Sequence, residues 1–225
     1  MGLVMIVVLI LFMLNLVTGI PYAEPPIGKL RFKQTVPLKP DATTKVSTTN
    51  INGQQLKPIM CVQSLLAFNT STKNQISEDC LYLNIWTPNL TPSARLPVML
   101  WIHGGSYLHG SAFEVDTNGQ LLFNGTQLAL RDVVVVAINY RLGVFGFLYA
   151  GGREAPGNMG NWDQNAALQW VHNTIGNFGG NPDDITLVGQ SVGGLSVSGH
   201  MFSRFSRQLF KKAIIQSGRL LNWHS

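Results

Sequence analysis

The sequence Gly189-Gln190-Ser191-Val192-Gly193 has the residue types and the spacing of an activated serine. In a G-x-S-x-G turn between a strand and a helix, the serine hydroxyl projects from a sharp bend as a nucleophile. Gly189 and Gly193 suit such a turn because it is strained and crowded, with little room for a Cβ atom. A chance Gly-Ser-Gly loop is the alternative, and the apolar run over 185–188 argues against it. The motif predicts that Ser191 is a nucleophile for acyl transfer.

A second glycine motif could supply the donors that stabilise an oxyanion. The sequence His103-Gly104-Gly105-Ser106 follows an apolar run, as the oxyanion loop of such hydrolases follows a strand. We expect the backbone N–H groups of Gly105, Ser106 and Val192 to surround the oxyanion, with Gly104 shaping the loop. Each donor of this type lowers the activation barrier by about 3 to 4 kcal/mol. A simple glycine-rich turn is the alternative reading of this segment.

A serine nucleophile also needs a base, and the base needs a group that orients it. No Asp or Glu lies between Ser191 and the last residue of the chain. His200 falls within the helix expected after the serine, so we expect it to point away, and His224 is expected to fray. Three further histidines are expected to be loop, surface or core residues: His103, His109 and His172. We therefore predict little or no turnover by this chain alone.

The elements that must position these motifs alternate between strand and helix. Short apolar runs predict strands over 81–86, 98–102, 133–138, 185–188 and 213–215. Helical patterns cover 161–177 and 195–210. Residues 19–60 are rich in Pro, Thr and Lys, show little periodicity, and are predicted to be irregular. The alternation predicts an α/β architecture with a largely parallel sheet and helices on both faces.

Composition is globular and gives no sign of a nucleic-acid partner. The chain has 225 residues, 45% of them hydrophobic, which is enough for one sizeable core. Only 12% are charged, about half the usual share, as expected if part of an outer shell were absent. The net charge of +5 comes from scattered basic residues, with no basic stripe interleaved with aromatic residues. We expect no nucleic acid, no metal and no cofactor, and the oligomeric state is left open.

The first residues of the chain predict entry into the secretory pathway. Residues 1–17 are apolar apart from Asn15, which favours a signal peptide ending near residue 18 over an uncleaved membrane anchor. Association with a membrane through this segment is the alternative. The only cysteines, Cys61 and Cys80, make one possible pair. Glycosylation sequons begin at Asn69, Asn89 and Asn124. Together these features predict a protein that is secreted or lies on the extracellular face of a membrane.

Many short segments, in the same order along the chain, resemble the carboxylesterase type B family. This family includes carboxylesterases, cholinesterases and non-catalytic neuroligin-like adhesion proteins. The matching segments are GIPYA at 19–23, SEDCLYLN at 77–84, HGG at 103–105, NYR at 139–141, GNMG at 157–160, DQ at 163–164 and the serine motif. The resemblance covers nearly everything from Gly19 onward. It implies an α/β-hydrolase fold, Cys61–Cys80 as the first family disulfide, Ser191 as the nucleophile, and a small ester as substrate.

The departures from the family pattern shape the functional prediction. Family members are much longer, and their triad acid and histidine lie beyond the matched part, so residues 19–225 are expected to be the N-terminal part of an incomplete domain. Gln190 replaces the usual Glu and lacks its charge, and Val192 replaces the usual Ala. Phe68 is the only aromatic residue between the cysteines, where cholinesterases carry a tryptophan that stacks on choline.

We therefore predict a serine carboxylic ester hydrolase that works through an acyl-enzyme. A non-catalytic adhesion or decoy protein is the alternative, and a cholinesterase is less favoured. If covering segments are absent, the strand at 213–215 should expose apolar surface, and we expect aggregation or dependence on a partner chain.

Overall fold

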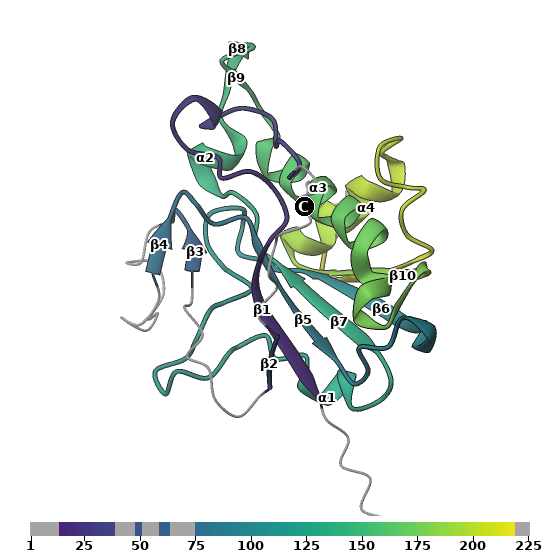
Figure 1. Ribbon diagram of the computed structural model, residues 1–225. Coiled ribbons are helices and arrows are strands. Elements are labelled where there is room, and N and C mark those ends of the chain that lie inside the picture. Colours follow the sequence, from purple (N-terminus) through teal and green to yellow (C-terminus); the bar gives the residue numbers. More distant parts are fainter. Residues whose placement is uncertain (1–13, 39–47, 51–58, 64–74, 219–225) are drawn as a thin grey trace, which may run out of the picture.

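The computed structural model describes residues 14–38, 48–50, 59–63 and 75–218, and it is built around one large mixed sheet (Figure 1). In the described part of the chain this sheet has seven strands in the order β11-β10-β6-β7-β5-β1-β2. Strands β7, β6, β10 and β11 are mutually parallel, whereas β5, β1 and β2 pair antiparallel. The strands are β1 (Asn15–Pro21), β2 (Thr48–Asn50), β5 (Tyr82–Thr87), β6 (Leu96–Ile102), β7 (Val134–Ile138), β10 (Gly180–Gln190) and β11 (Lys212–Gln216).

Helical crossovers connect the parallel strands, as parallel pairing requires. The long connection from β7 to β10 contains α3 (Met159–Thr174) and the 3-10 turn η4 (Ile175–Phe178), and α4 (Val192–Phe202) joins β10 to β11. Strand β6 lies between β7 and β10 in the sheet. The chain therefore runs from β6 to its neighbour β7 on one side, and later crosses back to β10, its neighbour on the other side. Ligands of open α/β sheets bind at such a switch point, outside the carboxyl ends of the strands. The carboxyl ends of β6 and β10 carry the two glycine motifs.

Shorter elements decorate the sheet. They are η1 (Gly28–Leu30), η3 (Pro92–Ala94), α1 (Thr126–Ala129), α2 (Gly143–Phe147), the parallel pair β3 (Ile59–Cys61) and β4 (Gln75–Ser77), and the hairpin β8 (Tyr149–Gly152) with β9 (Ala155–Pro156). Figure 1 shows this hairpin projecting from the body of the molecule, beyond α2.

Both faces of the central strands bury apolar side chains, which explains why β6, β7 and β10 read as continuous apolar runs. On one face the strands pack against α3 and α4 through fully buried residues, among them Leu100, Val136, Leu187, Leu168 and Val197. On the other face Trp86, Val135 and Ala137 pack against Phe113 and Ala129 from the connection between β6 and β7. The predicted α/β architecture is confirmed, and so are the five predicted strands and the helix at 161–177.

Two boundaries differ from the sequence prediction. The helix after the serine ends at Phe202 rather than at residue 210, because Ser203 takes an extended backbone and its hydroxyl accepts the Phe205 N–H. Residues 15–21 form β1 instead of ending a leader and starting an irregular segment, and Val17 is fully buried against β5. Gly19, at φ 65°, lies where the register of β1 shifts, which breaks the alternating pattern that would have revealed the strand. The apolar leader at 1–13 lies outside the described residues.

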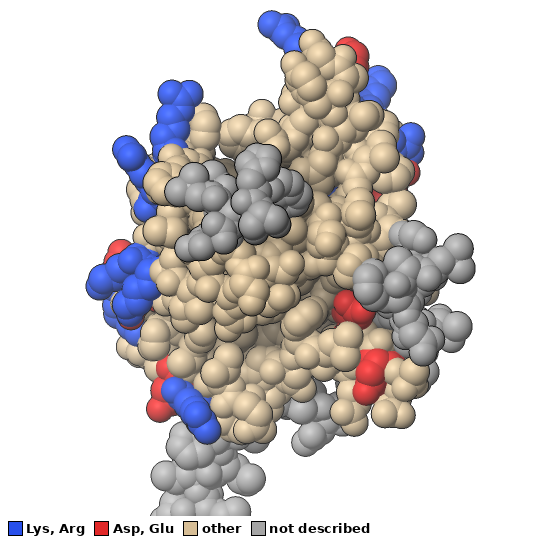
Figure 2. All heavy atoms as spheres, turned by 180° about the vertical axis from the view of Figure 1, so that it is seen from behind, with Lys and Arg blue, Asp and Glu red and all other residues tan. Residues whose placement is uncertain are grey.

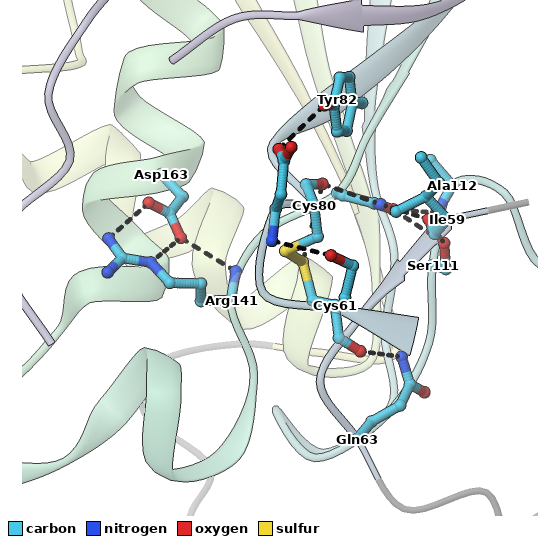
Figure 3. Close-up of a disulfide and its surroundings, with 12 residues drawn as sticks. Ile59, Cys61, Gln63, Cys80, Tyr82, Ser111, Ala112, Arg141 and Asp163 are labelled. Atoms are coloured by element: carbon cyan, nitrogen blue, oxygen red, sulfur yellow. Dashed lines mark hydrogen bonds and ion pairs between the residues drawn. A yellow bond between two sulfur atoms is a disulfide. The ribbon is translucent and has the colours of Figure 1, made fainter. Parts of the chain in front are cut away.

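A buried ion pair ties the chain after β7 to α3. Asp163 accepts hydrogen bonds from Arg141 at three points, the backbone N–H (2.9 Å), Nε (2.8 Å) and Nη2 (2.8 Å). Arg141 Nη1 also donates to the carbonyl of Lys33 at 2.9 Å. Figure 3 shows this pair beside the disulfide region. Its donors and acceptors are satisfied, so the pair fixes the start of α3 relative to the sheet.

Cys61 and Cys80 form the disulfide that the family resemblance implies (Figure 3). It joins β3 to the segment that enters β5. Asn139 supports the same region: its Nδ2 donates to the carbonyls of Ile59 (2.8 Å) and Cys80 (3.1 Å). Its Oδ1 accepts from Ser111 Oγ at 2.8 Å and from the N–H of Ala112 at 2.9 Å. Asn139, which follows β7, thus joins β3, the segment at Cys80 and the segment at 111–112.

Charged side chains are sparse on the surface. In Figure 2 they lie mainly at the margins of the face shown, and its centre is formed by uncharged residues. Large apolar side chains are exposed near the last strand, where Phe202 is 76% and Ile214 is 40% exposed. Across the described ranges, no helix combines the length and the hydropathy needed to cross a membrane.

Candidate active site

Ser191 occupies a strained turn between β10 and α4. Its backbone has φ 54° and ψ −126°, a conformation that non-glycine residues avoid unless the surrounding structure holds them there. Two hydrogen bonds hold it: the Ser191 N–H donates to the carbonyl of Gln216 at 2.8 Å, and its carbonyl accepts from the N–H of Leu195 at 3.0 Å. The turn therefore presents the serine at the carboxyl edge of the sheet, between β6 and β11.

The glycines on either side of Ser191 are required by close backbone contacts. A methyl group on Gly189 would collide with the backbone of Gly193, and one on Gly193 would collide with the carbonyls of Ile102 and His103. These contacts bring the first turn of α4 directly against the end of β6. The serine motif at 189–193 and the glycine loop at 103–106, at least 83 residues apart in sequence, thus meet as one packed unit.

The glycine loop lies against the serine itself. A methyl group on Gly104 would lie 3.2 Å from Ser191 Cβ and 2.8 Å from both the carbonyl oxygen and Oε1 of Gln190. The exposed Gln190 side chain, singled out in the sequence, therefore borders the glycine loop. Gly105 has φ 109° and Ser106 has φ 56°, so the loop turns sharply away from the end of β6.

The carbonyl groups of His103, Gly104 and Gly105 have donors, whereas the N–H groups of Gly105 and Ser106 are open. Tyr140 Oη donates to the carbonyl of His103 at 2.9 Å, and His103 Nδ1 bonds the carbonyl of Gly104 at 2.8 Å. The carbonyl of Gly105 accepts from the N–H groups of Leu108 (2.9 Å) and His109 (3.1 Å). Within the part of the chain that the structure describes, the N–H groups of Gly105 and Ser106 have no acceptor. Val192 begins α4, where first-turn N–H groups lack intrahelical partners.

A serine in a strained strand-to-helix turn, with unpaired N–H groups beside it, is the arrangement that α/β hydrolases have at the nucleophile elbow. The family model described as "Carboxylesterase family" matches residues 15–224. The chain belongs to the carboxylesterase family. Its α/β sheet is accordingly part of the α/β-hydrolase fold that the family resemblance implied.

Individual relatives in the carboxylesterase family match over the same region. The chain is 44% identical to "Carboxylesterase 1D" of Rattus norvegicus over 214 residues, covering 90% of this chain and 35% of that protein. It is also 44% identical to "Pyrethroid hydrolase Ces2e" of Rattus norvegicus (89% and 34% covered) and to "Acetylcholinesterase 1" of Caenorhabditis elegans (89% and 32% covered). The chain thus spans about a third of the length of these relatives.

In this carboxylesterase-family chain the buried histidine of α4 faces away from the serine. His200 is 6% exposed, and its Nδ1 and Nε2 bond Ser206 Oγ (2.8 Å) and Gln164 Oε1 (3.0 Å). Burial lowers the pKa of His200 from 6.5 to about 4, so the ring is neutral at physiological pH. Both nitrogens are engaged with α3 and the segment after α4, so His200 is not available as a base for Ser191.

The other histidines of the described chain do not supply a base either. His103 is buried, stacks on Tyr140 with ring centroids 4.4 Å apart, and has its pKa lowered to about 4, chiefly by burial. Partial burial also lowers the pKa of His109, which lies beyond the bend of the loop. His172 lies in the last turn of α3, which leads through η4 to the amino end of β10, whereas Ser191 follows its carboxyl end; His224 is outside the described residues. Among the described residues, no cluster of metal-ligating side chains is present.

Two cavities lie away from the serine. A cavity of about 460 Å³ lies between α3 and α4, with Tyr107, Trp162, His200 and Phe205 in its walls. A second, of about 310 Å³, lies on the opposite face of the sheet beside Trp101 and Phe123. Ser191 lines neither of them.

Sequence reasoning missed the residues that hold the glycine loop. Tyr140 follows β7 in the NYR segment, which appeared only as a family match, and Gln63 follows the first cysteine. Both act on backbone groups distant in sequence, so no local spacing signals them. Their roles become visible only once β6, β7 and the disulfide segment lie together.

Proposed function

We propose that this chain carries the nucleophile and the oxyanion donors of a serine carboxylic ester hydrolase. The observation that carries the proposal is the strained turn of Ser191 packed against a loop with unpaired N–H groups. Ser191 Oγ attacks the ester carbonyl carbon while a base accepts its proton. The carbonyl oxygen becomes an oxyanion that accepts hydrogen bonds from Gly105, Ser106 and Val192. The alcohol leaves with a proton, and water then releases the acid from the acyl-enzyme.

The base is expected to come from outside the described residues. Among the described residues no histidine is hydrogen-bonded to the Ser191 side chain, and His200 and His103 are both committed to other partners. We therefore infer that the 225-residue chain alone turns over slowly or not at all, and that full activity needs a histidine and an acid supplied by further chain. The absence of a base among the described residues also supports the second candidate, a secreted adhesion or decoy protein without turnover.

We infer that the substrates are neutral rather than cationic esters. Gln190 borders the glycine loop with a neutral amide, so no charge at that position attracts an ammonium group. The relatives do not decide the point, because a carboxylesterase and an acetylcholinesterase match with the same identity. The Phe68 observation lies outside the described residues. The acyl and alcohol groups are left open.

We also infer that the protein enters the secretory pathway through its apolar leader, which must end before strand β1 begins at Asn15 rather than at residue 18. The Cys61–Cys80 disulfide supports an oxidising compartment. Two of the three sequons lie within the described chain, and both Asn89 and Asn124 are exposed, as glycosylation requires.

Labelling with a fluorophosphonate tests the proposed chemistry directly, with free imidazole added as an external base. We expect the wild-type chain to be modified at Ser191, with a rate that rises with imidazole concentration. Ser191→Ala should abolish labelling, whereas Ser203→Ala, on an exposed segment after α4, should not. Rapid ester hydrolysis without imidazole would contradict the missing base, and no labelling under any condition would favour the decoy.

A further inference from the structure

We propose that His103 is a positioning residue, which orients the N–H of Gly105 toward the oxyanion, and that Gln63 holds the loop around it. The inference rests on the proposed ester hydrolysis and deepens it, since it concerns how one of the three donors is fixed. Gly104 and Gly105 have no side chains of their own with which to restrain their peptides. A restraint must therefore come from neighbouring groups.

The peptide plane transmits the restraint. A trans peptide is planar, so the carbonyl of one residue and the N–H of the next point in opposite directions. The described chain contains no cis peptide, and His103 Nδ1 lies 2.8 Å from the carbonyl oxygen of Gly104. Because a carbonyl only accepts, Nδ1 must carry the proton. This bond pulls the Gly104 carbonyl toward the imidazole and turns the N–H of Gly105 away from it.

The other two donors are held by backbone alone. The N–H of Ser106 shares its peptide with the Gly105 carbonyl, which accepts from two N–H groups farther along the loop. The N–H of Val192 shares its peptide with the Ser191 carbonyl, which accepts from Leu195 within α4 at 3.0 Å. Only the Gly105 donor depends on a side chain. A substitution at His103 therefore reaches one donor of the three.

Packing on both faces holds the imidazole in place. Its ring stacks on Tyr140, whose hydroxyl donates to the His103 carbonyl at 2.9 Å. On the other side a methyl group on Gly110 would lie 2.5 Å from His103 Nδ1 and 2.8 Å from the Gly104 oxygen. The backbone at 110 thus covers the hydrogen bond between His103 and Gly104. The ring is only 1% exposed, so water does not compete for that bond.

Gln63 fixes the covering segment. Its Oε1 accepts the N–H of Gly110 at 2.8 Å, and its Nε2 donates to the Gly110 carbonyl at 3.0 Å. The same Nε2 donates to the carbonyl of Cys61 at 3.0 Å, a bond drawn in Figure 3. The disulfide segment, the backbone at 110 and the imidazole therefore form one continuous chain of contacts that ends on the Gly104–Gly105 peptide.

Two substitutions at His103 separate a hydrogen-bonding role from a packing role. His103→Phe keeps a ring to stack on Tyr140 but has no donor. His103→Asn loses the ring but places an amide nitrogen the same number of bonds from Cβ as Nδ1. The experiment measures fluorophosphonate labelling with imidazole, and separates the maximal rate from the half-saturating probe concentration. It also measures the ¹⁵N order parameter of the Gly105 amide and the melting temperature of each variant.

We expect His103→Phe to lower the maximal labelling rate roughly 10- to 100-fold, with the half-saturating concentration unchanged. The Gly105 order parameter should fall in this variant. His103→Asn should retain most of the rate and of the order parameter, even if it melts at a lower temperature. Gln63→Ala should show a smaller loss of rate, again without a change in half-saturation.

The reverse ranking, with His103→Phe labelled like wild type and His103→Asn impaired, would overturn the proposal. Equal order parameters for Gly105 in wild type and His103→Phe would also overturn it. If wild type is not labelled at all but its Gly105 order still depends on the His103 donor, the positioning holds and the proposed hydrolysis fails. The two inferences can therefore fail separately.

Discussion

The two sides of Ser191 treat a buried histidine in opposite ways. On the glycine-loop side (residues 103–110), the imidazole of His103 makes one hydrogen bond and has no partner on Nε2 within the described chain. On the α3–α4 side (residues 158–174 and 195–206), both nitrogens of His200 are bonded. Gln164, which bonds His200, also donates from its Nε2 to Ser196 Oγ at 3.2 Å. Ser196 Oγ in turn shares a hydrogen bond with Tyr107 Oη at 3.0 Å.

From this difference we infer that the α3–α4 side is a structural network and that the glycine-loop side serves the proposed chemistry. Buried polar groups are normally paired, so the satisfied α3–α4 side reads as a framework. The glycine-loop side instead pairs its carbonyls and leaves N–H groups open beside a strained serine, an arrangement that costs stability unless a ligand uses it. We therefore expect substitutions on the α3–α4 side to reduce stability before chemistry, and those in the glycine loop to reduce chemistry before stability.

Asp163→Ala should give the largest effect, and it should fall on stability. Removing this carboxylate leaves the buried Arg141 guanidinium without its partner, which typically costs about 3–5 kcal/mol of the free energy of unfolding. Urea unfolding measures the loss. Asp183→Ala is the matched control, because Asp183 pairs with Arg95 on the surface and should change stability little. Equal losses in the two variants would mean that the α3–α4 side is not a framework.

Gly104→Ala should affect chemistry instead. Its methyl group would lie 2.8 Å from the Gln190 carbonyl, so the loop must move away from Ser191 and the oxyanion donors with it. We expect labelling with fluorophosphonate and imidazole to slow by roughly 10²- to 10³-fold, the scale of one lost donor. Gly176→Ala is the control, since nothing lies within 4 Å of a methyl group there. A loss of unfolding free energy without a loss of labelling rate would reverse the assignment of the two sides.

Stability should fall as the pH is lowered from about 6.5 to about 4. The pKa of both His103 and His200 is lowered to about 4 by burial, so between these values the unfolded chain binds more protons than the folded one. Each histidine contributes about 3 kcal/mol across this window, and above it the contribution is constant.

Chemical unfolding at a series of pH values measures the slope. His200→Gln keeps hydrogen-bonding groups but does not titrate, so it should remove about half of the part of the slope that the two buried histidines contribute. An unchanged slope in this variant would show that the α3–α4 side does not bury a neutral imidazole. The carboxylates titrate in both wild type and His200→Gln, so their contribution cancels when the two slopes are subtracted.

The sequence predicted the parts of this molecule that rest on local pattern. Apolar runs located the central strands, and the two glycine motifs located the backbone that meets at the switch point. Strand β1 could not be predicted, because the bulge near Gly19 and the preceding apolar residues hide its alternation. The end of α4 depended on one serine hydroxyl that competes for a backbone N–H.

The sequence predicted Ser191 as nucleophile and the N–H groups of Gly105, Ser106 and Val192 as donors, and these roles stay predictions, although the structure brings the two motifs together. What holds the donors was not predictable. Tyr140 acts on His103 across 37 residues of sequence, and Gln63 acts on Gly110 across 47. Such contacts leave no periodicity, and they follow from the topology that brings the ends of β6 and β7 beside the disulfide segment.

Gln190→Glu should give the smallest effect and sharpen the comparison at the boundary between the two sides. The exposed side chain borders the glycine loop, so a carboxylate there would attract cationic groups without altering the loop peptides. A phosphonate probe with a trimethylammonium leaving group and its neutral tert-butyl isostere report this preference. We expect the ratio of their labelling rates to rise by roughly two- to fivefold at low salt and to fall back at high salt, because exposed charges are screened.

Gln208→Glu adds the same charge on the exposed segment after α4 and should leave the ratio unchanged. An equal rise in both variants would assign the effect to net charge, and slower labelling by both probes in Gln190→Glu would show that this residue acts on the oxyanion donors instead.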